Sequence, residues 1–251
     1  MHSFISPAVF NPKSIPNLYA WYKFDNLILS GVSPTQTVSA ALDKSGGNRH
    51  AIQPIAGQQP NYTSAGGSNG FPYWTNTDAV SGGRYLLAGT TSDWTFLHNG
   101  TGFTIFLIMK VNSTQQNYFF GTQTGTGASL GTTFVRINNT TAQMSVGNAA
   151  QHIVSQNYSQ TLTAWAKLSV SGSTGSDPDY SIRVNGSSVA NANPVAAVST
   201  TTSTQKLGIG SGGGGAYSIA SDFHEVIIYN RELSLQEVQK IEQYLKVQYK
   251  L

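Results

Sequence analysis

The sequence predicts an all-β sandwich that is closed by a single C-terminal helix. Only 10% of the 251 residues are charged, against roughly 25% in an average soluble domain. Short β-rich segments recur between clusters of Gly, Asn, Ser and Thr, which is the pattern of a sandwich. One amphipathic segment near the C-terminus has helical periodicity instead. A length of 251 residues fits one such domain.

The N-terminal residues differ from the rest of the chain. Pro7, Pro12 and Pro16 punctuate residues 1–17, which predicts an extended arm that docks on the domain or on a neighbouring subunit. We find no linker and no repeat after it, so residues 18–251 are expected to form a single domain. Residues 1–7 lack a basic region and an apolar stretch, so we expect no secretory signal peptide.

The strands are predicted from local hydrophobic patterns. Residues 103–110 are almost continuously apolar, which predicts a central strand buried on both faces. Further strands are expected at residues 117–121, 134–137, 143–146, 165–170, 206–209 and 223–229.

Two connections can be assigned from their glycines. Asn185-Gly186 lies between alternating segments, which predicts a hairpin with a type I′ turn. Residues 210–215 are rich in glycine and form a connection between two strands. No Gly-Lys-Ser/Thr sequence follows them, so they are not a phosphate-binding loop.

The C-terminal helix begins at a capping box in which Ser234 is the N-cap and Glu237 reaches back to it. Glu242 and Lys246 are spaced as an i,i+4 ion pair. Four residues at helical spacing form one apolar stripe that would pack on the sandwich: Val238, Ile241, Leu245 and Tyr249.

Charge and cysteine content exclude several classes of partner and cofactor. The net charge is only +3, and Lys and Arg form no cluster, so we expect no nucleic-acid partner. No apolar run approaches the ~18 residues of a membrane span. The chain has no cysteine, which excludes disulfides, thiolate zinc sites and a cysteine nucleophile.

The titratable residues show no catalytic or metal-binding spacing. The five histidines lack a metal-ligand pattern, and no G-x-S-x-G elbow accompanies the many serines. Asp177 and Asp179 could hold a calcium ion, although a solvated turn is the preferred interpretation. Asp43 could also donate to a metal, but an Asx-turn over Ser45 and Gly46 is preferred. We therefore expect no metal and no cofactor.

Four segments together resemble a known family. Residues 16–25, 42–51 (L-D-K-S-G-G-N-R-H-A), 222–234 (D-F-H-E-V-I-I-Y-N-R-E-L-S) and 241–249 are similar to laminin-G-like, concanavalin A-like jelly-roll domains. The resemblance implies two antiparallel sheets in a jelly-roll sandwich. It also implies a lone module of the kind found in bacteriophage virion proteins and bacterial surface proteins. The fold alone does not determine the function.

Glycoside hydrolysis is the enzymatic activity that the resemblance invites. It requires two carboxyl groups about 5–10 Å apart. All four glutamates lie in the last strand, turn and helix, and the seven aspartates are scattered. The E-x-D-x-x-E strand that glucanases of this fold share is missing, so we expect no catalytic residue and no enzymatic activity.

Aromatic residues in loops are the candidate glycan-binding residues: Tyr73, Trp74, Trp94 and Tyr217. Sugars stack on exposed aromatic rings, but aromatic side chains are more often buried. For Trp74 the two alternatives are equally supported. Trp21 and Trp165 lie in strand-like alternation and are expected in the core.

We therefore expect a non-enzymatic structural protein of a bacteriophage virion, which decorates the capsid or forms part of a head or tail appendage. Its low-charge, polar surface suits the packing of many copies. Its partners would be other virion proteins or copies of itself, and a host-surface glycan in addition. The alternative is a carbohydrate-binding adhesin of a phage tail or a bacterial surface. The expected location is the virion, after synthesis in the host cytoplasm, or alternatively the bacterial cell surface.

Overall fold

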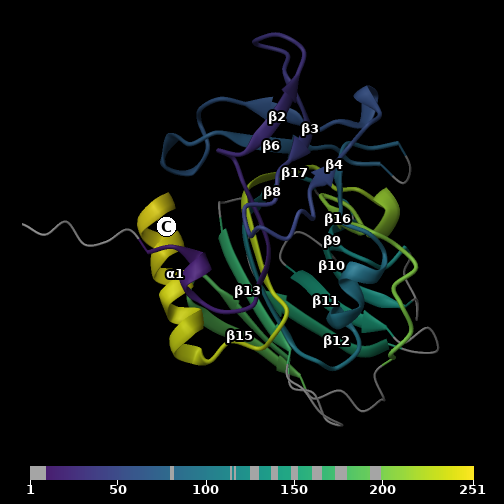
Figure 1. The fold of residues 1–251 in the computed structure, drawn as a ribbon, viewed down its shortest axis with the longest axis vertical. Helices are drawn as coiled ribbons and strands as arrows, with labels where there is room; N and C mark the ends of the chain where they lie inside the picture. The colour runs from purple at the N-terminus through teal and green to yellow at the C-terminus, as the bar shows by residue number, and fades with distance from the viewer. Residues whose placement is uncertain are drawn as a thin grey trace, which may run out of the picture.

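The computed structural model describes residues 10–79, 82–113, 115, 117–124, 130–136, 141–147, 152–159, 166–172, 180–192 and 199–251. The strands form two antiparallel layers that are joined at one end, with helix α1 (Leu235–Tyr249) outside them (Figure 1). No helix in these ranges is long and apolar enough to cross a membrane. This architecture is an antiparallel β-sandwich with one C-terminal helix, as predicted.

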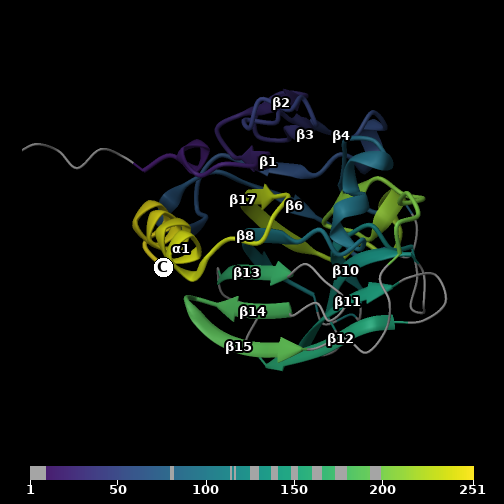
Figure 2. The same cartoon turned by 60° about the horizontal axis from the view of Figure 1, so that its bottom comes forward.

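The first layer runs in the order β1, β17, β8, β13, β14, β15, and every pairing in it is antiparallel. Figure 2 shows β13, β14 and β15 in succession below β8. The bounds are β1 (Leu18–Lys23), β8 (Phe103–Val111), β13 (Ala166–Gly172), β14 (Tyr180–Val184), β15 (Ser187–Ala192) and β17 (Ser221–Tyr229).

The second layer runs in the order β4, β7, β16, β9, β10, β11, β12. Its bounds are β4 (Ala51–Ile52), β7 (Leu86–Ala88), β9 (Tyr118–Gly121), β10 (Gly131–Arg136), β11 (Thr141–Gly147), β12 (His152–Ser159) and β16 (Leu207–Ile209). Four strands connect the layers at one end: β2 (Leu27–Ser30), β3 (Thr37–Ala41), β5 (Asn61–Thr63) and β6 (Tyr73–Asn76).

Five short 3-10 helices lie in the described connections: η1 (Pro12–Ser14), η2 (Ala56–Gln58), η3 (Ser68–Gly70), η4 (Ser92–Leu97) and η5 (Gly213–Gly215). The glycine-rich connection predicted at residues 210–215 thus contains η5, between β16 and β17.

The central strand β8 is buried on both faces, as its continuous apolar character predicts. Ile105 and Leu107 point into the main core between the layers. Phe106 and Ile108 point the other way, into a second core under helix α1. Burial on both sides explains why this strand does not alternate between apolar and polar residues.

Helix α1 has the predicted capping box. The Ser234 side chain accepts a hydrogen bond from the Glu237 backbone N–H, and the Glu237 side chain accepts one from the Ser234 backbone N–H. The predicted apolar stripe is buried in the second core. Each cap satisfies an N–H group that the first helical turn leaves without a partner.

The predicted ion pair between Glu242 and Lys246 is wrong. The Arg183 Nε atom on β14 donates to Glu242 Oε1 at 2.9 Å, and Lys246 is exposed. Glu242 faces the sheet and is buried, so its side chain meets the strand residue beneath it rather than a neighbour on the outer helix face. The hairpin prediction is confirmed, because Asn185 and Gly186 have φ values of 50° and 84°, as a type I′ turn requires.

Residues 10–17 pack on the domain to which they belong. Ile15 is buried in the second core, and the Tyr229 hydroxyl donates to the Pro12 carbonyl at 2.8 Å. Phe10 contacts Tyr244 on helix α1, with 6.0 Å between ring centroids. The remainder of the predicted arm, residues 1–9, lies outside the described residues.

Candidate ligand-binding groove

An open groove with a volume of about 410 Å³ lies beside the first strand. Its lining residues come from η1 and its N-cap, from β1, from the turn after β1 and from the loop after β3. They are two lysines, two asparagines and a tryptophan: Asn11, Lys13, Trp21, Asn26 and Lys44. The groove therefore combines two cations, two amides and one aromatic ring.

Trp21 is held from three sides. Its indole Nε1 donates a 2.6 Å hydrogen bond to Glu225 Oε1 on β17. Its backbone N–H donates to Asp43 Oδ1 at 3.0 Å, and its carbonyl accepts from the Lys44 N–H at 2.7 Å. Because only 6% of Trp21 is exposed, the ring has a fixed position at the wall of the groove.

The Glu225 carboxylate beneath Trp21 is fully buried. It also accepts hydrogen bonds from the Tyr244 hydroxyl at 3.0 Å and the Tyr249 hydroxyl at 2.6 Å, both on helix α1. Burial raises the pKa of Glu225, and the charge of Lys23 together with the three donated hydrogen bonds opposes that rise. Glu225 thus connects the helix, the sheet and the wall of the groove.

The two lysines lie at different places in the groove. The Lys44 Nζ atom is 5.2 Å from the centroid of a Trp21 ring and 2.7 Å from Asp25 Oδ1. A cation over an indole face is attracted by the negative potential of the ring. Lys13 lies on η1 and is exposed. Both ammonium groups are therefore within reach of a ligand from solvent.

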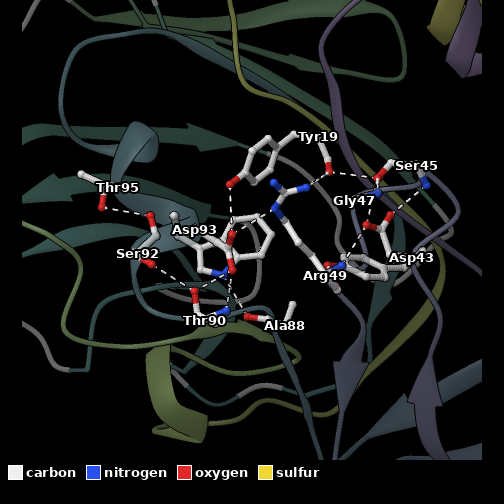
Figure 3. Close-up of polar contacts among 12 residues, drawn as sticks. Tyr19, Asp43, Ser45, Gly47, Arg49, Ala88, Thr90, Ser92, Asp93 and Thr95 are labelled. Atoms are coloured by element: carbon white, nitrogen blue, oxygen red, sulfur yellow. Dashed lines mark hydrogen bonds and ion pairs between the residues drawn. The ribbon is translucent and has the colours of Figure 1, made fainter.

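The loop that carries Lys44 is built on Asp43 (Figure 3). Asp43 Oδ1 accepts from the Ser45 backbone N–H at 2.8 Å, and Oδ2 accepts from the Ser45 hydroxyl at 2.8 Å and the Arg49 N–H at 3.1 Å. The predicted Asx-turn is confirmed. With Trp21 also bonded to Asp43, this turn joins the loop to the edge of β1.

Arg49 connects the same loop to η4, as Figure 3 shows. Its guanidinium lies 3.6 Å from the centroid of the Tyr19 ring and donates to Asp93 Oδ1 at 3.1 Å. Burial acts to raise the pKa of Asp93, but hydrogen bonds from Thr90 and Arg49 outweigh it, so the pKa is lowered. The carboxylate therefore stays ionised and holds the loop on the domain.

Trp74 and Trp94, two of the four candidate glycan-binding residues, are both fully buried, so for Trp74 the buried alternative holds. Trp74 alternates inward on β6 and stacks on Phe223, with 5.8 Å between centroids. Trp94 lies in η4, where its Nε1 donates to the Ala88 carbonyl at 2.8 Å. Neither ring offers a face to a sugar.

Tyr73 and Tyr217 are partly exposed, and their predicted glycan binding stays a prediction. Tyr73 faces His224 on the outer side of β6, with 6.0 Å between ring centroids. Tyr217 lies edge-on to Tyr118, with 5.6 Å between centroids. Neither of them lines the groove, so the structure does not bring the four predicted residues together.

Sequence reasoning missed the residues that do line the groove. Trp21 was expected in the core, and it is buried, but it also forms a wall of the groove. Lys13 and Lys44 were not singled out because each is an ordinary loop residue in the sequence. Only the hydrogen bonds of Asp43 to Trp21 and Ser45 bring the Lys44 loop beside β1.

The described histidines and carboxylates do not gather into a metal site. In the residues that the structure describes, no three His, Asp or Glu side chains are close enough to hold an ion. Asp177 and Asp179 lie outside those residues. His224 is buried, which lowers its pKa to about 4; its neutral ring accepts from the Ser68 N–H and faces the Pro72 carbonyl.

Solved structures with a similar fold are receptor-binding and binding domains of botulinum neurotoxins. The type G receptor-binding domain has a TM-score of 0.61 and 11% identity, over 91% of this chain and 51% of that one. A second similar structure is of botulinum neurotoxin type C, whose cell entry is dependent upon interaction with two ganglioside molecules. Its TM-score is 0.56 and its sequence identity 12%, and the match covers 88% of this chain and 52% of that one. The type DC binding domain in complex with rat synaptotagmin II has a TM-score of 0.55 and 12% identity, over 88% and 52%.

At sequence identities of 11% and 12%, the similarity to these structures shows the fold alone. The chain spans about half the length of each matched structure. No curated protein sequence matches it significantly. A family model described as the concanavalin A-like lectin/glucanases superfamily matches residues 81–239, which is more than half of the chain. The chain therefore belongs to the concanavalin A-like lectin/glucanases superfamily.

Proposed function

We propose that this domain is a non-enzymatic binding module that holds a glycan in the groove beside β1. The observation that carries the proposal is the lining of the groove: two amide side chains and two ammonium groups around an indole. Amides and ammonium groups pair with sugar hydroxyls, and the small exposed part of the Trp21 indole forms a fixed wall beside them. A volume of about 410 Å³ is in the range of small-ligand sites, roughly 300–1,000 Å³.

The groove has the chemistry of binding rather than of hydrolysis. Glycosidases place two carboxyl groups on either side of the bond that breaks. None of the five lining residues carries a carboxyl group. Glu225, directly behind Trp21, is buried and accepts three hydrogen bonds from protein donors. A buried carboxylate with three protein donors holds the side chains of those donors, Trp21, Tyr244 and Tyr249, in position.

The similar solved structures support a binding function by analogy. One is described as a binding domain in complex with rat synaptotagmin II, and another concerns a neurotoxin whose cell entry is dependent upon interaction with two ganglioside molecules. This chain matches about half of each, so the analogy concerns the class of function and does not identify a ligand.

We further propose that the domain is carried on the surface of a bacteriophage virion, on the capsid or on a head or tail appendage. The low content of charged residues supports this location, because a polar surface with few charges suits side-by-side packing of many copies. A phage-tail or bacterial surface adhesin is the second candidate, favoured by the groove itself. Co-sedimentation of the purified chain with phage particles tests the first: a chain that stays monomeric and never sediments with a particle contradicts it.

Glycan binding is tested with an array, followed by calorimetry on the best ligand. A Lys13→Trp variant fills the groove from an exposed position and leaves the core untouched. Lys240→Trp, on the exposed face of helix α1, is the matched control. We expect the wild type and the control to bind, and Lys13→Trp to lose at least about tenfold in affinity, or about 1.4 kcal/mol. A wild type that binds no glycan contradicts the proposal, as does a Lys13→Trp variant with unchanged affinity.

A further inference from the structure

The charge around the groove is uneven for a protein with so few charges. Only 25 of the 251 residues are Lys, Arg, Asp or Glu, from 14 basic and 11 acidic residues. Two of the lysines, Lys13 and Lys44, line the groove, and its lining contains no acidic side chain. Lys23 lies behind it, where its Nζ donates to the Tyr244 hydroxyl at 3.1 Å. Two cations therefore line one small volume, and Lys23 is buried.

The carboxylates near these lysines neutralise them only in part. Asp25 is 2.7 Å from Lys44 and 3.9 Å from Lys23, and its side chain is 41% exposed. The pair between Lys44 and Asp25 is weak, because water competes for both partly exposed charges. Lys44 is paired with Asp25, and Lys23 lies near both Asp25 and Glu225. The positive charge that faces the groove is therefore carried mainly by Lys13 and only in part by Lys44.

Lys13 has the most open position. Within the ranges that the structure describes, no carboxylate lies within ion-pair distance of its ammonium group. The residue is exposed on η1, a short helix fixed by Asn11, whose Oδ1 accepts from the Lys13 backbone N–H at 3.0 Å. The backbone under this lysine is thus ordered while its charge is directed to solvent.

The asparagines on the two sides of the groove can bind neutral groups. Asn11 Oδ1 caps η1, which leaves its NH₂ group as a donor toward the groove. Asn26 Nδ2 donates to the Leu42 carbonyl at 3.1 Å, which leaves its Oδ1 as an acceptor. One amide donor and one amide acceptor, in a groove that two lysines also line, match a saccharide that carries hydroxyl groups beside an acidic group.

We propose that the groove selects saccharides that bear an anionic group, a carboxylate or a sulfate, and that Lys13 and Lys44 pair with that group. The inference rests on the proposed glycan-binding function and specifies its ligand class. Lys44 exchanges its exposed partner Asp25 for the anion, and Lys13 on η1 pairs with the same anion. Trp21, held by Glu225, fixes the wall of the groove beside which the saccharide lies.

The test compares matched neutral and acidic sugars on the same protein. Calorimetry or NMR titration measures lactose, sialyllactose and sulfated lactose against the wild type, Lys13→Gln, Lys44→Gln and the double variant at low salt. Lys240→Gln is the control for loss of a lysine outside the groove. Circular dichroism confirms that each variant is folded.

We expect the wild type to prefer an acidic sugar over lactose by at least about tenfold. Each lysine variant should reduce that ratio about threefold to tenfold, and the double variant should bring it near one. Lys240→Gln should leave it unchanged. Binding that favours only the sialylated or only the sulfated sugar supports the proposal and identifies the source of the anion.

Three results overturn the inference. If lactose binds as tightly as both acidic sugars, the groove does not select for charge, while glycan binding itself stands. If the preference survives in the double variant, the two lysines do not provide it. If none of the three sugars nor any array glycan binds the wild type, both the inference and the proposed function fail.

Discussion

The indole Nε1 of Trp21 donates a 2.6 Å hydrogen bond to a carboxylate oxygen of Glu225, 204 residues further along the chain. The same carboxylate accepts from Tyr244 and Tyr249. One buried acid thus joins the wall of the groove to the C-terminal helix. Because the contact is buried and charge-assisted, it is among the stronger hydrogen bonds that a protein makes.

Removing this acid should destabilise the domain strongly. Glu225→Ala leaves an indole N–H and two phenol groups without their acceptor in a buried site, for which we expect a loss of about 3–5 kcal/mol in the free energy of unfolding. Tyr244→Phe removes one donor only and should cost about 1–2 kcal/mol. Urea denaturation measures both. A Glu225→Ala protein as stable as the wild type would show that the carboxylate does not connect helix and sheet.

Acid should destabilise the domain through His224. Burial lowers the pKa of this histidine from 6.5 to about 4, so between those pH values the unfolded state binds a proton that the folded state does not. The free energy of unfolding is unaffected by protonation of His224 above pH 6.5. It decreases as the pH falls from 6.5 toward 4, by about 1.4 kcal/mol per pH unit at most. An NMR titration of the His224 ring tests the cause directly. A folded-state pKa near 6.5 would contradict it.

The partner of Glu242 can be tested by double-mutant cycles. The ion pair with Arg183 is largely buried, with side-chain exposures of 18% and 9%. We expect a coupling energy of about 1–2 kcal/mol between Arg183 and Glu242. The same cycle between Glu242 and Lys246 should give a few tenths of a kcal/mol or less. A larger coupling energy between Glu242 and Lys246 than between Glu242 and Arg183 would contradict the structure and support the pair that sequence spacing predicts.

The capping box sets the start of helix α1. Ser234→Ala removes the side chain that accepts from the Glu237 N–H, and it should cost about 1 kcal/mol of stability. Gln236→Ala, at an exposed position in the same turn, is the matched control and should change stability by less than about 0.5 kcal/mol. Equal effects in chemical denaturation would mean that the cap does not stabilise the helix.

Local sequence patterns predicted the elements whose structure is determined locally. The apolar run at β8, the Asn185-Gly186 turn and the cap at Ser234 each depend on neighbouring residues, and each is confirmed. The face on which Trp74 lies depends on how β6 pairs with β17. A sequence shows that the side chains of a strand alternate, but it does not show which face is buried. The exposure of Trp74 could therefore not be decided from the sequence.

The groove depends on contacts that are distant in the sequence, and this is why sequence reasoning did not find it. Lys13, Trp21 and Lys44 meet because β1 pairs with β17 and because Asp43 accepts from the backbone of Trp21. The partner of Glu242 was missed for the same reason, since Arg183 comes from a strand rather than from the helix. Spacing within one element predicts neighbours on that element only.

The most direct test of the central claim follows the four indole N–H signals by NMR while an acidic saccharide, sialyllactose or sulfated lactose, is added to labelled protein. Trp21 lines the groove, whereas Trp74 and Trp94 lie in the main core. We predict that the Trp21 signal, assigned by its loss in a Trp21→Phe variant, shifts in a saturable manner while those of Trp74 and Trp94 stay in place. A Trp21 signal that does not move at saturating ligand, while another signal does, would contradict binding in this groove.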